Sequence, residues 1–352
     1  MDTTLRLYIR RGDRSGKVAD VQARLRGLGL ELLDDTGSFD GGTEKAVRAF
    51  QQARGILVDG IVGPHTWREL VEAGWRVGDR PLYLRNPPLR GDDVEKLQTR
   101  LNALGFDAGR ADGIFGRNTD DAVRSFQREY DVEEDGIFGP RSLSALTGLR
   151  VERSGTASTL REELRRVESS GTRGALIIVD PGHGASDEGE RGSGGHSEAD
   201  LCWDLATRLA ERLSAAGARV RFTRSEADAP DDTERARRAN ELDADLFLSL
   251  HLNAHAQGSA EGASAYYWAG STAGSLLAEA VQTRLVALGL RDCRAHARSY
   301  PILKETRMPA VLIEPVFITN PEDQHRVEDP GFRAAVAGAI AGAVDHYYQT
   351  GR

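Results

Sequence analysis

The chain of 352 residues contains only two cysteines, Cys202 and Cys293. Two cysteines in a chain of this length make no disulfide framework, so we expect free thiols and infer no oxidising compartment. Long apolar runs are also absent. No segment reaches the roughly 18 residues that span a bilayer, and the N-terminus lacks the roughly 7 to 15 apolar residues of a secretory signal. The sequence as written predicts no membrane segment and a cytoplasmic location.

Positive charge is not in excess either, since 46 Lys and Arg face 54 Asp and Glu for a net charge of −8. A chain without a general basic field is not expected to bind nucleic acid or anionic lipid. Hydrophobic residues make up 39% and charged residues 28% of the chain, as in ordinary globular proteins. The length exceeds the usual size of one domain, so two or three domains are expected.

Two segments of the N-terminal half match each other without a gap when the chain is shifted by 76 residues. Apolar residues recur at helical spacing in each copy, which predicts three short helices per copy. Thr43 and Thr119 are expected to cap the second helices, and a Gly-Pro pair is expected to begin each third helix. Among the coincident residues are Val18 with Val94, Gln22 with Gln98, Phe50 with Phe126, and DGIVGP at 59–64 with DGIFGP at 135–140.

These copies, at 10–72 and 86–148, resemble the small three-helix peptidoglycan-binding domain of bacterial wall hydrolases, through AVRAFQ, DGIVGP and DGIFGP. The resemblance implies binding to wall glycopeptide, although the same small helical fold also serves as a spacer or a protein-docking surface. Residues 149–173 are expected to form a linker, in which LREELRRVE at 160–168 has the i,i+4 charge pairs of a solvated helix.

From residue 174 to 349 the pattern changes to apolar strands that alternate with longer helical segments. This order predicts an α/β domain with a largely parallel or mixed sheet flanked by helices. The expected strands are ALIIVD, ARVRFTR, DLFLSLHLN, GASAYYW and AVLIEPVF.

Three of these strands carry a chemically active residue at or just past their carboxyl ends, namely His183, His251 and Glu314. Ligands bind at that edge of parallel sheets, and Glu198 lies in a loop that can reach it. Zinc accepts two imidazoles and one carboxylate and keeps a fourth position for water, and a second carboxylate can take the proton of that water. Spacing alone favours a metal hydrolase but leaves a structural-zinc or metal-free site open.

Five ordered motifs resemble those of the zinc N-acetylmuramoyl-L-alanine amidases, which cleave the bond between the lactyl group of muramic acid and L-alanine. They are VDPGHG at 179–184, SEADL at 197–201, FTR at 222–224, RARRANELDADLFLSLHLNA at 235–254 and PAVLIEPVFITNPED at 309–323. The resemblance implies one zinc ion held by His183, Glu198 and His251, catalysis by Glu314, and a peptidoglycan or muropeptide substrate that is reached at the cell wall by export or release.

Two departures from the family pattern are visible. Val316 stands where the family usually has glycine and is expected to tighten the groove near Glu314, and the loop DEGERGSGGHSE at 187–198 brings His196 within possible reach of the metal. We expect His196, His255 and His296 not to be ligands, because the ligand set is complete without them. Asn253 is a candidate for a hydrogen bond to substrate, with a structural turn role equally open. Arg224 is expected to cap its own strand end.

Two other functions stay open. The layout, with GWRVGDR between the repeats and with LCWDLA, DCRAH and TRMPAVLIE, resembles the actinobacterial CwlM-type amidase homologues, which include cytoplasmic regulators of wall synthesis. Such a regulator would act by binding cell-wall synthesis proteins. A phage-type endolysin is the third reading, since a holin would release it to the wall.

Overall fold

The computed structural model describes residues 8–149, 171–192, 194–255 and 258–350. The chain divides into two compact units, Met1–Ser158 and Thr159–Arg352, here called the helical unit and the α/β unit. The expected linker at 149–173 lies mostly outside the described residues, as does its expected helix at 160–168. In the part of the chain that the structure describes, no helix is long and apolar enough to span a membrane.

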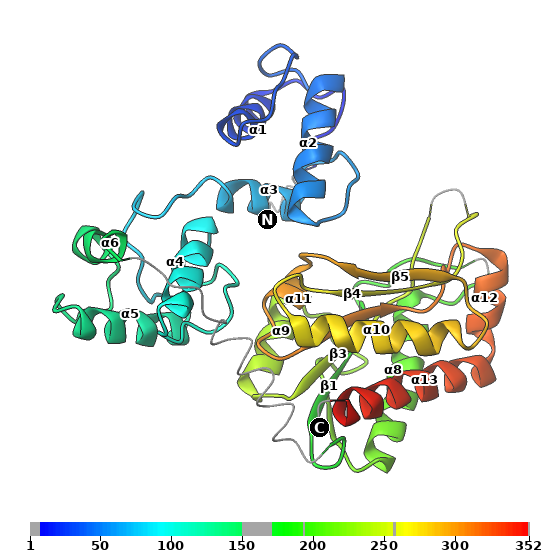
Figure 1. The fold of residues 1–352 in the computed structure, drawn as a ribbon. Coiled ribbons are helices and arrows are strands. Elements are labelled where there is room, and N and C mark those ends of the chain that lie inside the picture. Colours follow the sequence, from blue (N-terminus) through cyan, green and yellow to red (C-terminus); the bar gives the residue numbers. More distant parts are fainter. Residues whose placement is uncertain (1–7, 150–170, 193, 256–257, 351–352) are drawn as a thin grey trace. The chain divides into compact units, whose positions relative to one another are not determined.

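The helical unit consists of two sets of three helices, which confirms the predicted fold class (Figure 1). Each set closes around its own apolar core, one centred on Leu25, Val47 and Phe50 and the other on Leu101, Val123 and Phe126. The helices are α1 (Gly16–Gly27), α2 (Gly41–Arg54), α3 (Pro64–Glu72), α4 (Asp92–Ala103), α5 (Arg117–Glu129) and α6 (Pro140–Thr147).

Four buried glutamines fix the loops between successive helices. The side chain of Gln51 on α2 accepts a hydrogen bond from Gly60 N at 2.8 Å and donates to Asp59 Oδ1 at 2.7 Å, Ile61 O at 3.0 Å and Thr66 Oγ1 at 3.2 Å. Gln22, Gln98 and Gln127 each hold a glycine amide and the first turn of the next helix in the same way. The glycines at these loops, Gly37, Gly60, Gly113 and Gly136, all have positive φ, which glycine adopts without strain.

The prediction that Thr43 and Thr119 cap the second helices is wrong. The capping positions are Asp40 and Gly116, and both threonines lie buried inside the first turn. Their hydroxyls instead receive hydrogen bonds from Gln22 and Gln98, each at 3.0 Å. The threonines belong to the glutamine-held loops and not to helix capping.

The α/β unit is built on a six-stranded mixed sheet in the order β2-β1-β3-β6-β4-β5, which confirms the predicted sheet class. Strands β1, β2, β3 and β6 are parallel, whereas β4 runs antiparallel to β6 and parallel to β5. The bounds are β1 (Leu176–Pro181), β2 (Arg219–Phe222), β3 (Leu246–Leu250), β4 (Ala263–Tyr267), β5 (Asp292–Ala297) and β6 (Ala310–Glu314). Sequence analysis missed β5, a polar edge strand without an apolar run.

Helices cover both faces of this sheet (Figure 1). One face packs against α8 (Glu198–Ala215), α10 (Thr272–Val286) and α13 (Pro330–Gln349), and the other against α9 (Asp232–Glu241) and α11 (Pro301–Lys304). Alternate strand residues go to opposite faces, as the pleat requires, so Leu248 packs with the first group and Phe247 with the second. A further helix, α12 (Pro321–Glu328), follows β6. The carboxyl ends of β1, β3 and β6 therefore meet at one edge.

Replacement of Gln51 by alanine should destabilise the helical unit by about 2 to 4 kcal/mol, because buried polar groups of the loop then lose their partners. The neighbouring Gln52 is exposed, so Gln52→Ala is the matched control and should change stability by less than about 0.5 kcal/mol. Hydrogen exchange of the Gly60 amide in the full chain measures the difference. Equal protection in the two variants would show that the glutamine does not hold the loop.

Candidate metal centre

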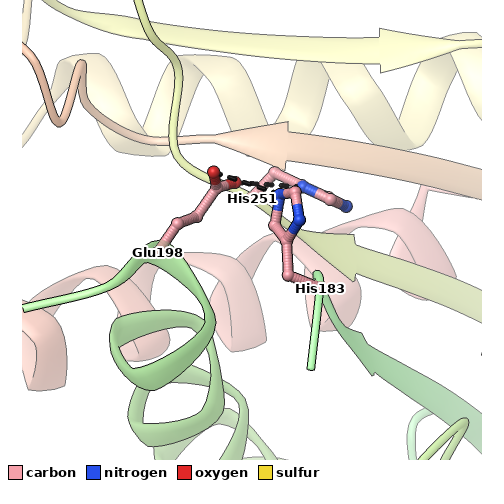
Figure 2. A group of neighbouring side chains, drawn as sticks. All are labelled: His183, Glu198 and His251. Carbon is pink, nitrogen blue, oxygen red and sulfur yellow. Dashed lines mark hydrogen bonds and ion pairs between the residues drawn. The ribbon is translucent and has the colours of Figure 1, made fainter. Parts of the chain in front are cut away.

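His183, Glu198 and His251 come together at the carboxyl edge of the sheet (Figure 2). His183 follows β1, His251 follows β3 directly, and Glu198 is the first residue of α8. The distance from His183 Nε2 to Glu198 Oε2 is 3.1 Å, and that from His251 Nδ1 to Glu198 Oε1 is also 3.1 Å. One donor atom from each residue lies within 4.8 Å of the others, so the three form a group that can hold a metal ion.

The spacing of these donors can be compared with a tetrahedral metal site. Bonds of 2.0 to 2.2 Å from zinc to nitrogen and oxygen place neighbouring ligand atoms about 3.3 to 3.5 Å apart. The two distances of 3.1 Å, one to each oxygen of Glu198, are close to that value. Two imidazoles and one carboxylate also match the donor types of catalytic zinc sites with an open position. The residues present therefore fit such a metal.

Further groups orient two of the three side chains, those of His183 and Glu198. His183 Nδ1 donates to Asp187 Oδ2 at 2.9 Å, which leaves Nε2 facing Glu198. The Glu198 carboxylate accepts from the backbone amides of Leu252 at 2.9 Å and Glu190 at 3.2 Å. A carboxylate behind a ligating histidine fixes its tautomer and raises its basicity. Sequence analysis did not assign Asp187, although its spacing of four residues from His183 was a usable signal.

Charge and burial shift the pKa values of this group in the metal-free protein. Burial alone would lower the pKa of His183, but hydrogen bonds and charge from Glu198 and Asp187 outweigh it and raise that pKa to about 9. Burial would raise the pKa of Glu198, yet His183 and His251 hold it well below its usual range. The site thus favours a charged carboxylate beside a cation, as a metal centre does.

Two glycines allow the close approach of these side chains. A Cβ atom at Gly182 would lie 2.5 Å from Cε1 and 2.6 Å from Nδ1 of His251. A Cβ atom at Gly189 would lie 2.7 Å from both Glu198 Oε2 and His183 Cδ2, and Gly189 also has a φ of 65°. Neither position has room for a side chain while the three donors keep their places.

Glu314, the last residue of β6, lies at the same sheet edge. Burial raises the pKa of its carboxyl to about 7, against the charge of His251 and side-chain hydrogen bonds with Tyr266 and Asn253. Its Oε2 atom is buried and has no hydrogen-bond partner among the described residues. An unpaired buried carboxylate oxygen with a pKa near neutrality is suited to accept a proton.

Asn253 lies beside this carboxyl and also belongs to the backbone that continues β3. Its backbone N–H donates to Val316 O at 2.8 Å, and its backbone carbonyl accepts from Ile318 N at 2.8 Å. The side-chain oxygen accepts from Ala254 N at 2.8 Å. Asn253 thus extends β3 and lies beside Glu314, whereas a hydrogen bond from Asn253 to substrate stays a prediction.

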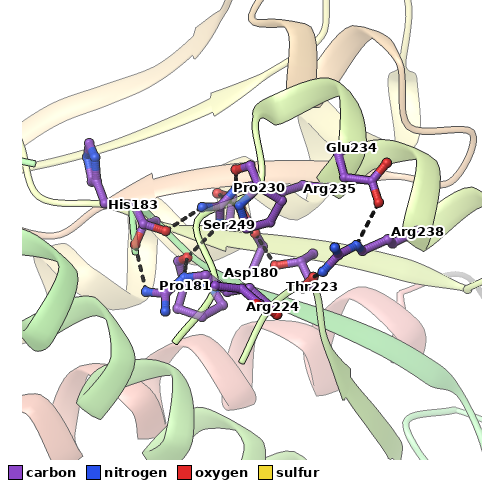
Figure 3. A network of polar contacts seen from close by, with 12 residues as sticks. Asp180, Pro181, His183, Thr223, Arg224, Pro230, Glu234, Arg235, Arg238 and Ser249 are labelled. Atoms are coloured by element: carbon purple, nitrogen blue, oxygen red, sulfur yellow. Dashed lines mark hydrogen bonds and ion pairs between the residues drawn. The ribbon is translucent and has the colours of Figure 1, made fainter. Parts of the chain in front are cut away.

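A buried polar network holds the ends of β1, β2 and β3 beneath the donors (Figure 3). Asp180 of β1 pairs with Arg235 of α9 at 2.9 Å and accepts from Ser249 of β3 at 2.6 Å and from Thr223 after β2. Arg224 was expected to cap its own strand end. It donates to Ser225 O, just past that end, at 3.1 Å, and also to the carbonyls at the end of β1. No role was predicted for Arg235, because one arginine of an arginine-rich helix carries no sign of burial.

The other candidates from the sequence lie apart from the three donors. His196 is exposed, its backbone carbonyl accepting from Gly192 N at 3.2 Å, and the ring of His296 contacts Cys293 O at 2.6 Å. His255 is also exposed. The expectation that Val316 tightens a groove is wrong, because its side chain is fully buried in the main core of the α/β unit.

Comparison with known proteins gives matches along nearly the whole chain. A family model described as N-acetylmuramoyl-L-alanine amidase matches residues 177–346, and one described as putative peptidoglycan binding domain matches residues 14–70 and 90–146. N-acetylmuramoyl-L-alanine amidase CwlM of Mycobacterium tuberculosis is 42% identical over 368 residues, covering 98% of this chain and 90% of that protein.

Two further similarities each cover about half of this chain. N-acetylmuramoyl-L-alanine amidase LytC of Bacillus subtilis is 36% identical over 179 residues, which are 50% of this chain and 36% of that protein. The crystal structure of N-acetylmuramoyl-L-alanine amidase from Clostridium difficile 630 is 31% identical and covers 51% of this chain and 98% of its own, with a TM-score of 0.49.

The Gly182→Ala variant should bind the metal about 10- to 100-fold more weakly than the wild type, because the new methyl group displaces the His251 ring. Gly338→Ala on α13 is the control, since its Cβ meets only the end of Arg212 at 3.9 Å. Competition with a chelator measures both affinities. Wild-type affinity in Gly182→Ala would show that the ring position does not matter.

Metal affinity should rise about tenfold per pH unit between pH 6.5 and 9, because the metal must displace the proton of His183. Because the pKa of His183 is higher in the folded protein than in the unfolded chain, its protonation stabilises the metal-free fold. This contribution is complete below about pH 6.5 and is lost as the pH rises through about 9. Metal titrations at several pH values check the rise in affinity, and melting of the metal-free protein at the same pH values checks the loss of stability. Asp187→Asn should reduce the rise of metal affinity with pH at the upper end of this range, because Asp187 helps to raise the pKa of His183. A metal affinity of the wild type that does not depend on pH would contradict the assignment of His183 as a ligand.

Proposed function

The chain belongs to the N-acetylmuramoyl-L-alanine amidase family, and on that premise we propose that His183, Glu198 and His251 hold one zinc ion while Glu314 activates the attacking water. The reaction is hydrolysis of the amide bond between the lactyl group of N-acetylmuramic acid and L-alanine in peptidoglycan. The observation that carries the proposal is the convergence of the three donors within 4.8 Å at the sheet edge where Glu314 ends β6.

The zinc assignment is supported by the donor set and its spacing. The three residues offer two imidazole nitrogens and one carboxylate oxygen, and Asp187 orients the first imidazole. When bound, zinc supplies Lewis-acid polarisation of the scissile carbonyl. The backbone amides of Leu252 and Glu190 hold the Glu198 carboxylate, so the donor does not need to reorganise on binding.

Glu314 acts as general base and then as general acid. Its carboxylate takes a proton from water as the oxygen attacks the lactyl carbonyl carbon, and it returns that proton to the alanine nitrogen as the carbon–nitrogen bond breaks. A pKa near 7 suits both directions of transfer at neutral pH. Asn253 and Tyr266 hold the carboxyl from two sides through their side-chain hydrogen bonds. Asn253 therefore acts on substrate through Glu314 in this proposal.

The two peptidoglycan-binding domains lie on the same chain as the catalytic unit. Attachment to the polymer raises the effective concentration of scissile bonds near the catalytic unit, without any new contact at the site. In our proposal the helical unit binds wall glycopeptide for this purpose. Its loss would reduce turnover of insoluble peptidoglycan more than turnover of small muropeptides.

Glu314→Gln should reduce the release of stem peptides with L-alanine N-termini from purified peptidoglycan by about 10²- to 10⁴-fold, because it removes the proton acceptor. Zinc content, measured by elemental analysis, should stay near one per chain, because Glu314 is not a ligand in this proposal. Glu322→Gln, at an exposed position on α12, is the matched control and should keep full activity.

Each other outcome has a definite meaning. Zinc bound without release, even from muropeptides, would overturn the catalytic assignment and favour a regulator that keeps the amidase fold. Release without bound metal would overturn the zinc site. Equal release by Glu314→Gln and the wild type would remove Glu314 from the reaction.

A further inference from the structure

The turn that carries His183 has a backbone conformation that its sequence does not explain. His183 has a φ of 57°, in the left-handed region that a residue with a side chain rarely adopts. Such a conformation costs about 1 to 3 kcal/mol and persists only where surrounding contacts enforce it. Two buried arginines contact the carbonyl groups of this turn (Figure 3).

Arg235 reaches this turn from α9. Its NH1 atom donates to Pro181 O at 2.7 Å and pairs with Asp180 Oδ1 at 2.9 Å, and its NH2 atom donates to the carbonyl of His183 itself. The remaining donor, Nε, bonds Pro230 O at 2.8 Å. The residue is 4% exposed. All three nitrogens of the guanidinium group are thus occupied, each in a fixed direction.

Arg224 reaches the same turn from the end of β2. Its Nε atom donates to Pro181 O at 2.8 Å and its NH2 atom to Gly182 O at 2.9 Å. The two arginines together hold three consecutive carbonyl groups, those of residues 181 to 183. With all three directed toward the guanidinium groups, the peptide planes of the turn are fixed, and with them the direction of the His183 side chain.

Asp180 connects Arg235 to β3, the strand that His251 follows. Its other oxygen accepts from Ser249 of β3 at 2.6 Å, and Ser249 lies two residues before His251. Residues two apart on a strand face the same side of the sheet, so the link joins the two histidine-bearing strand ends on one face.

We propose that Arg235 is a positioning residue for the metal centre, which sets metal affinity by holding the His183 turn in its left-handed conformation through the His183 carbonyl. The inference rests on the proposed zinc site and goes beyond its ligand set. In this proposal Arg235 contacts neither the side chains of the three metal ligands nor the substrate amide. Its effect is on where His183 Nε2 lies before the metal arrives.

The decisive variant is Arg235→Lys. Lysine keeps a positive charge beside Asp180 but lacks the planar fork that contacts Pro181 O and His183 O at once. The zinc affinity of the full chain should fall about 10- to 100-fold, as for other groups that orient metal ligands. Saturating zinc should restore kcat close to the wild-type value, because Arg235 does not take part in the reaction.

Arg333→Lys is the matched control for a general loss of stability. Arg333 on α13 is also largely buried, pairs with Asp204 and donates to Val327 O at 2.6 Å, but has no contact with the His183 turn. Melting of the metal-free proteins measures the loss of stability in each variant, and only Arg235→Lys should lose zinc affinity. Wild-type affinity in Arg235→Lys, or an equal fall in Arg333→Lys, would overturn the proposal.

A second variant covers the case in which Arg235→Lys does not fold. Asp180→Asn combined with Arg235→Met removes both charges, so no buried charge is left unpaired. The same fall in zinc affinity is expected, since the carbonyl contacts are gone, and unchanged affinity would overturn the proposal. Failure of the wild type to bind zinc would instead reject the proposed function, so the two failures are distinguishable.

Discussion

The buried ion pair between Asp180 and Arg235 is the interaction on which the catalytic half depends. Removing two charges from water costs several kcal/mol per ion, and only a well-satisfied pair recovers that cost. Here Asp180 also accepts from Ser249 and Thr223, and Arg235 also donates to three backbone carbonyls. The pair therefore joins β1, β2, β3 and α9 at the point where the sheet ends and the site begins. An apolar substitute would fill the space but could not fix the carbonyl groups.

Much of the site follows from elementary rules about strands. Parallel strands end at one edge, which predicted that His183 and His251 lie near each other, and the structure adds that β1 and β3 are direct neighbours. The apolar runs made those strands visible in the sequence. Strand β5 was missed because an edge strand is half solvated, and its alternation of exposed and partly buried residues resembles a loop. The fold class was thus predictable, whereas the polar edge strand β5 was not.

The contacts that orient the site were less accessible to sequence analysis than the site itself. Asp187 and Arg235 act through hydrogen bonds to a ring nitrogen and to a carbonyl, and neither residue type is unusual in its surroundings. The expected threonine caps failed for a related reason. The hydroxyl of Thr43 accepts a hydrogen bond from the carboxamide of Gln22, which lies 21 residues earlier in the chain. A capping rule that considers only neighbouring residues cannot include such a partner.

The glutamine-held loops also bear on the order in which the chain folds. Each carboxamide joins groups only 8 to 21 residues apart, from one helix to the start of the next. In the α/β unit, Ile177 pairs with Leu246, and Phe247 pairs with Ala310, across far longer stretches of chain. Short-range contacts form quickly, whereas long loops must first pay their closure entropy. During synthesis the helical unit emerges first and can be complete before β1, α8 and β3 leave the ribosome, so the metal donors that these elements carry assemble after the helical unit has folded.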